Sequence, residues 1–285
     1  MRGAEDTTSP FPAWRVRDRL ITLQVPAVMG ILNVTPDSFH SGSRVGPGEL
    51  LRRAEVMLQA GAAILDIGGA SSRPGATEVP LEEELRRVIP AILDVHRHFP
   101  EALLSVDTWR SVVAGEAVGA GAGMVNDIGA GLLDTDMLTT VARLGVPYIA
   151  MHMRGTPAIM QHDPQYADVT EEVTRFLSGR LTAAHATGIA DVMIDPGFGF
   201  GKTTAHNHAL LHGLRQLTRL GAPVVAGLSR KRMINEVLGT TPAEAQNGTT
   251  ALNTIALMRG ASILRVHDVR EAVEAVHLVG AGRRS

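Results

Sequence analysis

Eight short apolar runs recur along this sequence, and polar residues or glycines follow at the C-terminal end of each run. These end positions are Asn33, Gly68 and Gly69, Asp107, Asn126 and Asp127, His152, Asp195, Ser229 and His267. Turns after strands favour Asp, Asn, Ser and Gly as helix caps in any case. Eight such ends in succession, two of them histidines, indicate a shared binding site as well.

The elements that must position these residues follow a regular rhythm. Each apolar run is followed by a turn and then by an amphipathic stretch of helical period. The runs cover residues 28–32, 64–67, 103–106, 124–125, 148–151, 192–194, 224–226 and 263–266. This pattern predicts an α/β fold, a (β/α)₈ TIM barrel, in which the C-terminal strand ends converge on the rim that carries active sites.

The segment before the first run has a different character. Residues 14–23 partly alternate apolar and polar positions around Asp18, which predicts a short N-terminal hairpin that caps one end of the barrel. We expect residues 1–13 to form a disordered tail and residues 14–285 to form a single barrel domain.

The composition excludes several classes of protein. The chain has 285 residues, of which 45% are hydrophobic, a formal net charge of -2 and no cysteine. The near-zero charge provides no basic field for nucleic acid or anionic lipid, so we expect small-molecule ligands, no nucleic-acid partner and no membrane partner. The lack of cysteines and of an apolar N-terminal segment leads us to expect a cytoplasmic enzyme.

A glycine-rich segment at residues 195–203 (DPGFGFGKT) is similar to a nucleotide-binding phosphate loop. That loop requires a glycine five residues before Gly201, and Pro196 occupies this position, so the spacing fails. We instead predict a sharply bent loop whose backbone a flat ligand can approach, with Phe198 or Phe200 as an aromatic wall.

Cationic residues gather after the last two runs. Arg230, Lys231 and Arg232 precede a helix predicted to begin near Met233, which favours a site for an anion or a carboxylate. Arg265 and His267 are two residues apart and should share a strand face. Barrels of this type often bind phosphate at strands seven and eight, so a phosphoryl ligand is expected here.

Asp107, Asn126 and Asp195 suit hydrogen bonds to the N–H and C=O edges of a heterocycle. The two carboxylates alone are also compatible with the acid and base of a hydrolase. His206, His208 and His212 have no further ligand nearby in the sequence, so we favour solvent-facing histidines over a metal site.

Several blocks identify a family. Residues 29–39 (MGILNVTPDSF) and 71–76 (SSRPGA) resemble the first two loop signatures of dihydropteroate synthases. Residues 105–108 (SVDT), 126–128 (NDI), 151–155 (MHMRG), 195–202, 229–231 (SRK) and 265–269 (RVHDV) resemble further blocks in the same order. The resemblance runs from about residue 28 to residue 269.

The resemblance implies an enzyme of folate biosynthesis that joins a pterin pyrophosphate to p-aminobenzoate, releases pyrophosphate and is a target of sulfonamides. It implies a pterin site of Asp107, Asn126, Asp195 and Lys231. It implies a pyrophosphate site of Asn33, Arg73, Arg265 and His267, with Mg²⁺ near Asn33. It implies that Ser72, Pro74, Phe200, Lys231 and Arg232 frame p-aminobenzoate, and that Asp107, Arg73, Arg265 and His267 are catalytic. It also implies a homodimer.

The sequence departs from the family pattern at a few positions. Ala70 stands where Glu is usual, His40 and Ser41 replace Ser-Asp, and Trp109 is unusual after its block. These departures bear on loop closure, arylamine affinity and inhibitor response rather than on the reaction. Two other functions stay open: a catalytically silent pterin-binding paralogue, and the folate-binding barrel of a methyltransferase.

Overall fold

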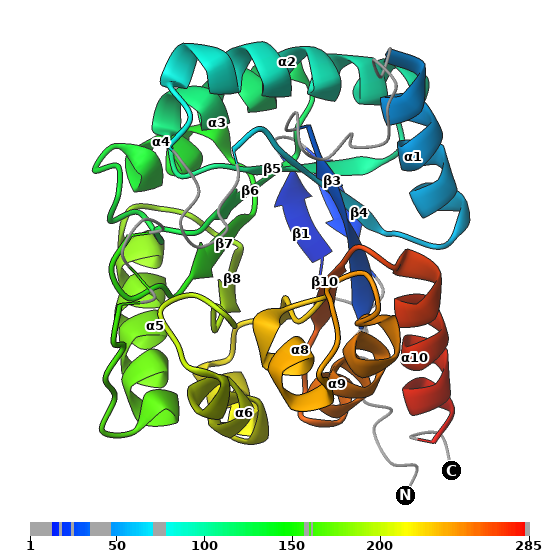
Figure 1. The fold of residues 1–285 in the computed structure, drawn as a ribbon. Coiled ribbons are helices and arrows are strands. Elements are labelled where there is room, and N and C mark those ends of the chain that lie inside the picture. The colour runs from blue at the N-terminus through cyan, green and yellow to red at the C-terminus, as the bar shows by residue number, and fades with distance from the viewer. Residues whose placement is uncertain are drawn as a thin grey trace, which may run out of the picture.

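The computed structural model describes residues 13–16, 19–23, 26–34, 47–70, 78–156, 160 and 162–282. Eight parallel strands within them form the predicted barrel, and each predicted run supplies one strand (Figure 1). The strands are β3 (Ala27–Asn33), β4 (Ile64–Gly68), β5 (Leu103–Asp107), β6 (Met124–Asp127), β7 (Tyr148–Met151), β8 (Val192–Asp195), β9 (Val225–Ala226) and β10 (Ile263–Val266).

The strand order closes the sheet into a ring. Strands β3 to β8 lie side by side in sequence order, and β10 lies between β3 and β9. A parallel bridge between Ile194 and Val224 joins β8 to the segment that leads into β9. All of these pairings are parallel, so the C-terminal strand ends share one rim.

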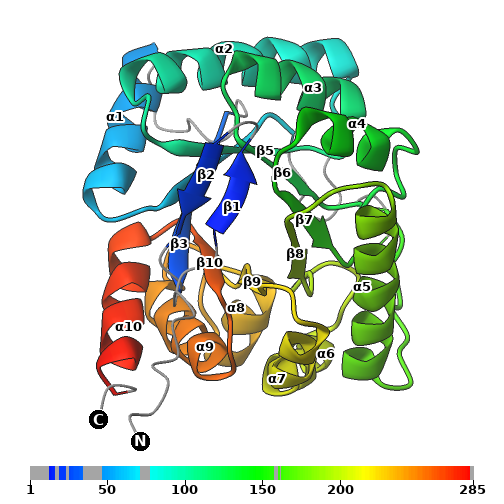
Figure 2. The same cartoon turned by 180° about the vertical axis from the view of Figure 1, so that it is seen from behind.

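Helices surround the outside of the barrel (Figures 1 and 2). They are α1 (Pro47–Gln59), α2 (Leu81–His98), α3 (Ser111–Ala120), α4 (Met137–Leu144), α5 (Val169–Ala186), α6 (Thr204–His212), α7 (Leu214–Leu217), the 3₁₀ helix η2 (Thr218–Leu220), α8 (Arg232–Leu238), α9 (Gln246–Met258) and α10 (Val269–Ala281). Among the described residues, no helix has both the length and the apolar character needed to cross a bilayer.

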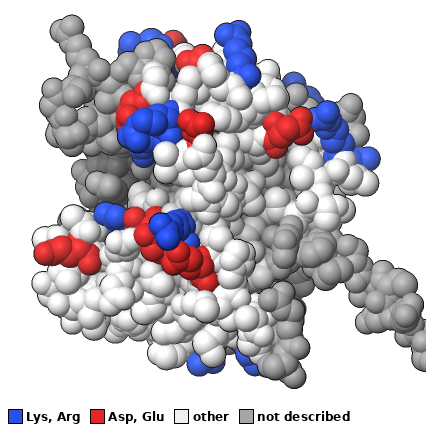
Figure 3. All heavy atoms as spheres, turned by 90° about the vertical axis from the view of Figure 1, so that its right-hand side faces the viewer, with Lys and Arg blue, Asp and Glu red and all other residues white. Residues whose placement is uncertain are grey.

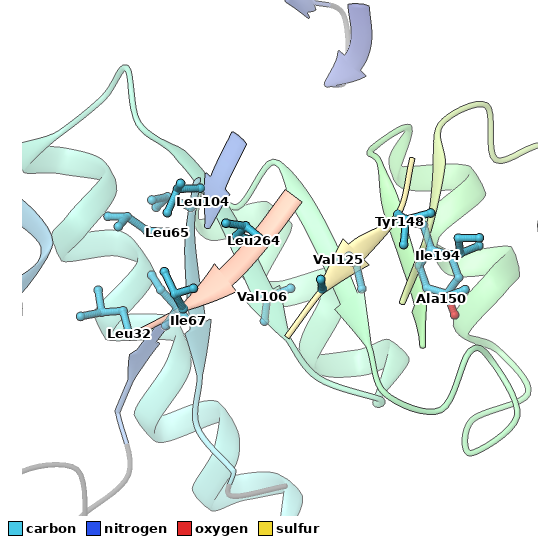
Figure 4. Packing of buried hydrophobic residues seen from close by; sticks show 14 of the residues in the cluster. Leu32, Leu65, Ile67, Leu104, Val106, Val125, Tyr148, Ala150, Ile194 and Leu264 are labelled. Carbon is cyan, nitrogen blue, oxygen red and sulfur yellow. The ribbon is translucent and has the colours of Figure 1, made fainter. Parts of the chain in front are cut away.

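Side chains alternate between the two faces of each strand, as the pleat requires. On β5, Leu104 and Val106 point outward and pack with Leu65, Ile67 and residues of the surrounding helices (Figure 4). Both are fully buried, so truncation of either to alanine would cost about 2–4 kcal/mol. This outer layer is the main core of the protein, and it leaves the inward-facing positions available for other roles.

The lower part of the barrel interior is apolar and is closed by the predicted hairpin. Strands β1 (Ala13–Val16) and β2 (Arg19–Thr22) pair antiparallel, and Figure 2 shows them across one end of the barrel. Trp14 is 3% exposed and packs in a cluster with inward-facing residues of the barrel strands. These are Met29, Ile64, Leu103, Met124, Ile149, Met193, Val225 and Ile263. The hairpin therefore plugs the barrel at the end opposite the rim.

The expected disordered tail lies outside the described residues except for Ala13, which is the first residue of β1. Two residues further along the strand from the apolar layer, the inward positions of β4, β5, β6, β8 and β10 turn polar. They are Asp66, Ser105, Asn126, Asp195 and Arg265. The strand period of two therefore places a polar layer directly above the apolar plug and below the rim.

Candidate active site

One arginine joins two carboxylates in the polar layer. Arg265 donates from Nε to Asp66 Oδ2 at 2.6 Å and from Nη2 to Asp107 Oδ2 at 2.6 Å. Asn126 donates from Nδ2 to the same Asp66 oxygen at 3.1 Å. Strands β4, β5, β6 and β10 thus contribute one side chain each to a connected cluster.

This cluster has a deficit of positive charge. Burial raises the pKa of Asp107 to about 7, and the nearby Asp66, Glu84 and Asp127 carboxylates act in the same direction while Arg265 opposes them. Burial disfavours the charge on Arg265, but Asp66 and Asp107 outweigh it and raise the pKa of the guanidinium. Burial, followed by the neighbouring carboxylates, therefore outweighs the single guanidinium at Asp107.

A second polar pair lies across the barrel mouth. Asp195 at the end of β8 accepts the Gly197 N–H at Oδ1 over 2.6 Å. Burial raises the pKa of Asp195, and Lys231 opposes this. Burial likewise lowers the pKa of Lys231 to about 8, against the effect of Asp195. Gly227 lies beside both groups, since a Cβ there would be 3.6 Å from Lys231 Nζ and 3.9 Å from Asp195 Oδ2.

The glycine-rich loop after β8 is built backbone against backbone. Gly197, Gly199 and Gly201 all have positive φ angles, of 65°, 84° and 62°. A Cβ at Gly197 would overlap the His152 carbonyl oxygen, and one at Gly201 would lie 2.6 Å from the Arg154 carbonyl oxygen. The loop therefore requires glycine for both conformation and space.

Lys202 holds this loop from inside and does not face the barrel mouth. It is 3% exposed, and its Nζ donates to the carbonyl oxygens of Gly197 at 2.9 Å and Phe200 at 3.0 Å. Its third partner is Nδ1 of His152, at 2.9 Å. Burial, followed by the Lys202 charge, lowers the pKa of His152 to about 2, so this imidazole is neutral. These contacts agree with the sequence analysis, in which the segment fails the spacing of a nucleotide-binding phosphate loop.

The two phenylalanines of the loop have different roles. Phe198 is fully buried in the outer core, whereas Phe200 is half-buried, with its ring centroid 4.9 Å from Lys231 Nζ. The Lys231 ammonium also donates to the Phe198 carbonyl oxygen. Of the two candidates for an aromatic wall, Phe200 is the one beside the mouth.

The three adjacent cations of the sequence separate in the structure. Arg230 pairs with Asp268 through two hydrogen bonds, of 3.0 Å and 2.7 Å. Lys231 turns inward toward Phe198 and Asp195, and Arg232 is an exposed side chain paired with Glu236 along α8. They do not form one anion-binding cluster, because each finds a different partner.

His267 lies at the end of β10 and contacts Ser229, whose Oγ is 2.9 Å from the His267 Nδ1. The same histidine lines a hollow of about 290 Å³ between α1 and α10, together with Arg52, Arg53 and Arg270. On the face that carries these helices, basic side chains lie beside acidic ones (Figure 3), as in the Arg270–Glu274 pair at 3.1 Å. The Arg270 charge is therefore compensated within its own helix.

Asn33 ends β3 next to Asp107 of the Arg265 cluster. A Cβ added to Gly68 would lie 3.5 Å from both Asn33 Oδ1 and Asp107 Oδ2, so the missing side chain leaves space between two side-chain oxygen atoms. In the part of the chain that the structure describes, no three His, Cys, Asp or Glu side chains form a metal site. Oxygen donors without a closed cage fit a Mg²⁺ ion held mainly by a phosphate ligand.

Ser72, Arg73 and Pro74, together with His40 and Ser41, lie outside the described residues. Two of the three clustered histidines, His206 and His208, are only partly exposed, whereas His212 is exposed as expected. His206 completes the N-terminal capping box of α6, and His208 lies 3.2 Å from the Met233 carbonyl oxygen, partly buried. Both therefore have structural roles.

The sequence reasoning missed Asp66. It sits inside an apolar run and is completely buried, yet it connects Arg265 with Asn126. A carboxylate at an inward position of an otherwise apolar strand was the available signal, because buried charges require partners. Asp127, in contrast, was one of the predicted strand-end residues but faces outward. It accepts hydrogen bonds from Tyr148 Oη, Gly129 N and Gly131 N and so stabilises the turn after β6.

Comparisons with known proteins agree with this geometry. Residues 29–267 match the family described as pterin binding enzyme. The chain is 44% identical over 264 residues to dihydropteroate synthase of Escherichia coli K12, covering 92% of this chain and 93% of that protein. It is similar to the solved Yersinia pestis dihydropteroate synthase with a sulfonamide drug complex (TM-score 0.90, 43% identity, 96% and 100% of the two chains).

Two similar solved structures, both of the Xanthomonas albilineans dihydropteroate synthase, contain bound ligands. The chain is similar to the structure with 4-aminobenzoic acid, with a TM-score of 0.89, 46% identity and coverage of 96% and 100% of the two chains. The structure in complex with 7,8-dihydropteroate has a TM-score of 0.86, 44% identity and the same coverage.

Proposed function

The chain belongs to the dihydropteroate synthase family of pterin-binding enzymes, and from this premise we propose how its residues divide the work of the reaction. As a member of this family it is a transferase of folate biosynthesis. It condenses 6-hydroxymethyl-7,8-dihydropterin pyrophosphate with p-aminobenzoate to give 7,8-dihydropteroate and pyrophosphate. The observation that supports the division of roles most directly is the polar layer of Asp66, Ser105, Asn126, Asp195 and Arg265 beneath the rim, to which Asp107 is bonded through Arg265.

The pterin is proposed to bind between the two halves of this layer. Asp195 would accept the amino group and the ring N–H of the pterin, since one of its oxygens is already held by Gly197 N–H. Asn126 and Asp107 would bind the opposite edge, and the Lys231 ammonium would donate to a ring acceptor. The Asn126–Asp66 bond supports this, because it fixes the amide orientation before substrate arrives.

The pyrophosphate is proposed to bind at the β3 and β10 ends, near Asn33, Arg73, Arg265 and His267. The contacts of Arg265 support this position, because its guanidinium bonds Asp107, whose Oδ2 lies beside Asn33 Oδ1 at the strand ends. Asn33 Oδ1, with Asp107 Oδ2 nearby, would be the protein ligand of Mg²⁺. When bound there, Mg²⁺ neutralises charge on the phosphate oxygens.

p-Aminobenzoate is proposed to bind against Phe200 and Lys231, with Ser72 and Pro74 on the other side. Its carboxylate would face the first turn of α8, which begins at Arg232. The Arg232 side chain pairs with Glu236, so the backbone at this helix start is the better-supported contact. The half-buried Phe200 ring offers the apolar wall that an aryl ring requires.

The chemical step is a substitution at the exocyclic methylene of the pterin. Its barrier is charge separation, because pyrophosphate leaves with the bonding electron pair while the arylamine nitrogen forms the new C–N bond. The proton that this nitrogen then loses passes to solvent. Arg265, Arg73 and His267 would stabilise the leaving group, and Asp107 would stabilise the positive charge that spreads over the pterin ring. The arylamine is neutral and nucleophilic at pH 7, so the site requires no strong general base.

One assay tests the activity. Purified protein is incubated with the pterin pyrophosphate, p-aminobenzoate and Mg²⁺, and dihydropteroate is measured. Tight pterin binding without product at any enzyme concentration would favour the silent paralogue. Product formation excludes the methyltransferase barrel, which has no pyrophosphate to release.

Two variants test the division of roles. Asp195→Ala should abolish pterin binding, whereas Arg73→Ala should preserve it and slow turnover. The reverse pattern would show that the two roles are exchanged.

We further propose a cytoplasmic enzyme, one barrel domain over residues 14–285, and a homodimer formed through outer helices. Val237 and Leu238 at the end of α8 and Met258 at the end of α9 are 62%, 53% and 61% exposed. Apolar side chains of this size support an interface there. Sedimentation analysis of Val237→Glu against the unmodified chain tests this proposal, because a charge in the interface would produce monomers.

A further inference from the structure

Ser229 is bonded twice to the same residue. It follows β9, is 5% exposed, and its Oγ accepts the backbone N–H of His267 at 3.2 Å. The same Oγ lies 2.9 Å from the ring Nδ1 of His267. One hydroxyl group therefore contacts both the ring and the backbone of His267.

The position of the hydroxyl proton follows from the available acceptors. Among the described residues, His267 is the one hydrogen-bond partner of Ser229 Oγ. If Nδ1 carried the proton, the Ser229 hydroxyl would accept two N–H groups and its own proton would be buried without an acceptor, which is costly. If the hydroxyl donates to Nδ1 instead, the hydroxyl proton, Nδ1 and the backbone N–H of His267 all have a partner. The ring proton must then reside on Nε2.

The backbone next to Ser229 is held in place by an independent set of contacts. Arg230 has a φ of 57°, a strained value for a residue with a side chain. Its guanidinium makes two hydrogen bonds to Asp268, and its backbone N–H donates to Thr249 Oγ1 at 3.0 Å. Residues 229–230 are thus joined to residues 267–268 at two successive positions, which explains how Ser229 keeps its orientation toward the ring.

We propose that Ser229 is a positioning residue that fixes His267 in the Nε2–H tautomer, so that the ring is a hydrogen-bond donor toward the leaving pyrophosphate. The inference rests on the pyrophosphate role proposed for His267. Pyrophosphate oxygens are acceptors, and the other tautomer would present a lone pair to them. In the proposed state, Ser229 determines which kind of ligand atom the histidine can bind.

Nuclear magnetic resonance of protein labelled with ¹⁵N-histidine tests the proposal through two-bond ¹H–¹⁵N correlations at about pH 8, where an ordinary imidazole is neutral. The His267 signals are assigned by their loss in His267→Gln. The unmodified protein should show Nε2–H alone, and Ser229→Ala should show a mixture of tautomers. A ring protonated at Nδ1 in the unmodified protein, or an unchanged tautomer in Ser229→Ala, would overturn the proposal.

Ser262→Ala is the matched control. Ser262 lies at the opposite end of the same strand pair, where its Oγ accepts Val224 N–H at 3.4 Å. This variant should keep the His267 tautomer, and a mixture here would overturn the specific role of Ser229. Turnover should fall about 10-fold in Ser229→Ala, the size of one hydrogen bond, and stay unchanged in Ser262→Ala. Failure of the unmodified protein to form dihydropteroate would refute the proposed function but would leave the tautomer result intact.

Discussion

Lys202→Met removes a side chain that the structure assigns to support rather than to phosphate binding. The lysine ammonium satisfies three buried acceptors: the carbonyl oxygens of Gly197 and Phe200 and the Nδ1 of His152. Methionine has similar length but no donor. The variant therefore isolates the loss of these hydrogen bonds from a change in packing volume.

The expected size follows from the acceptors that lose their donor. The Gly197 carbonyl oxygen keeps the Phe200 N–H at 3.1 Å, so the Phe200 carbonyl oxygen and His152 Nδ1 are the two affected. Each buried acceptor left without a donor costs about 1–3 kcal/mol. Removal of a buried ammonium, whose pKa is lowered well below its usual range chiefly by burial, returns part of this cost. We expect a net loss of about 3 kcal/mol in the free energy of unfolding. At about 2 °C per kcal/mol for a chain of this size, the melting temperature should fall by about 6 °C.

The assay combines thermal unfolding with steady-state kinetics for both substrates. Because the loop carries Phe200, the KM for p-aminobenzoate should rise, whereas the KM for the pterin pyrophosphate should change little. Lys231→Met is the matched control, since Lys202 and Lys231 are the only lysines in the chain. It should lower pterin affinity with a much smaller effect on stability.

The opposite pattern would refute this reasoning. A Lys202→Met variant with an unchanged melting temperature and a large rise in the KM for the pterin pyrophosphate would show that Lys202 binds phosphate directly. The glycine-rich loop would then have to be reinterpreted as an anion site.

Three further predictions follow from the site and the plug. In the unmodified protein, stability should fall as the pH rises from about 4 to about 7, because the folded state keeps the Asp107 proton up to a pKa of about 7 and the unfolded state loses it near the usual 3.8. The fall is up to about 1.4 kcal/mol per pH unit. Asp107→Asn should remove it, which denaturant titrations at several pH values would detect. Phe200→Ala should raise the KM for p-aminobenzoate about 10-fold without changing pterin affinity, and equal losses for both substrates in steady-state kinetics would contradict the assigned wall. Trp14→Ala should cost about 3–5 kcal/mol in unfolding free energy yet leave kcat unchanged, because the plug lies at the opposite end from the rim; a lower kcat would contradict that separation.

The barrel could be predicted from the sequence because strand period and polar strand ends are local signals. Asp107, Asn126 and Asp195 were predicted in this way, and the structure places them on the inward face. The failed phosphate-loop spacing at Pro196 was also a local signal, and the buried Lys202 agrees with it.

Pairing between distant elements could not be predicted. The sequence places Arg230 and Lys231 together, but Arg230 pairs with Asp268, 38 residues away, and Lys231 with the Phe198 carbonyl oxygen, 33 residues away. Asp66 was hidden for the same reason, since its role depends on Arg265, 199 residues away. A charge pattern specifies which groups are present, whereas three-dimensional contacts decide which of them remain available.

The glycines after β8 also determine where this enzyme can vary. Gly197 and Gly201 press against the carbonyl oxygens of His152 and Arg154, so neither position can gain a side chain without displacing main chain. These two positions of the proposed arylamine wall are therefore closed to substitution, whereas the Phe200 side chain can change without displacing main chain. Under selection by an arylamine mimic, resistance would have to arise at such side chains, where each change also alters contact with the natural substrate.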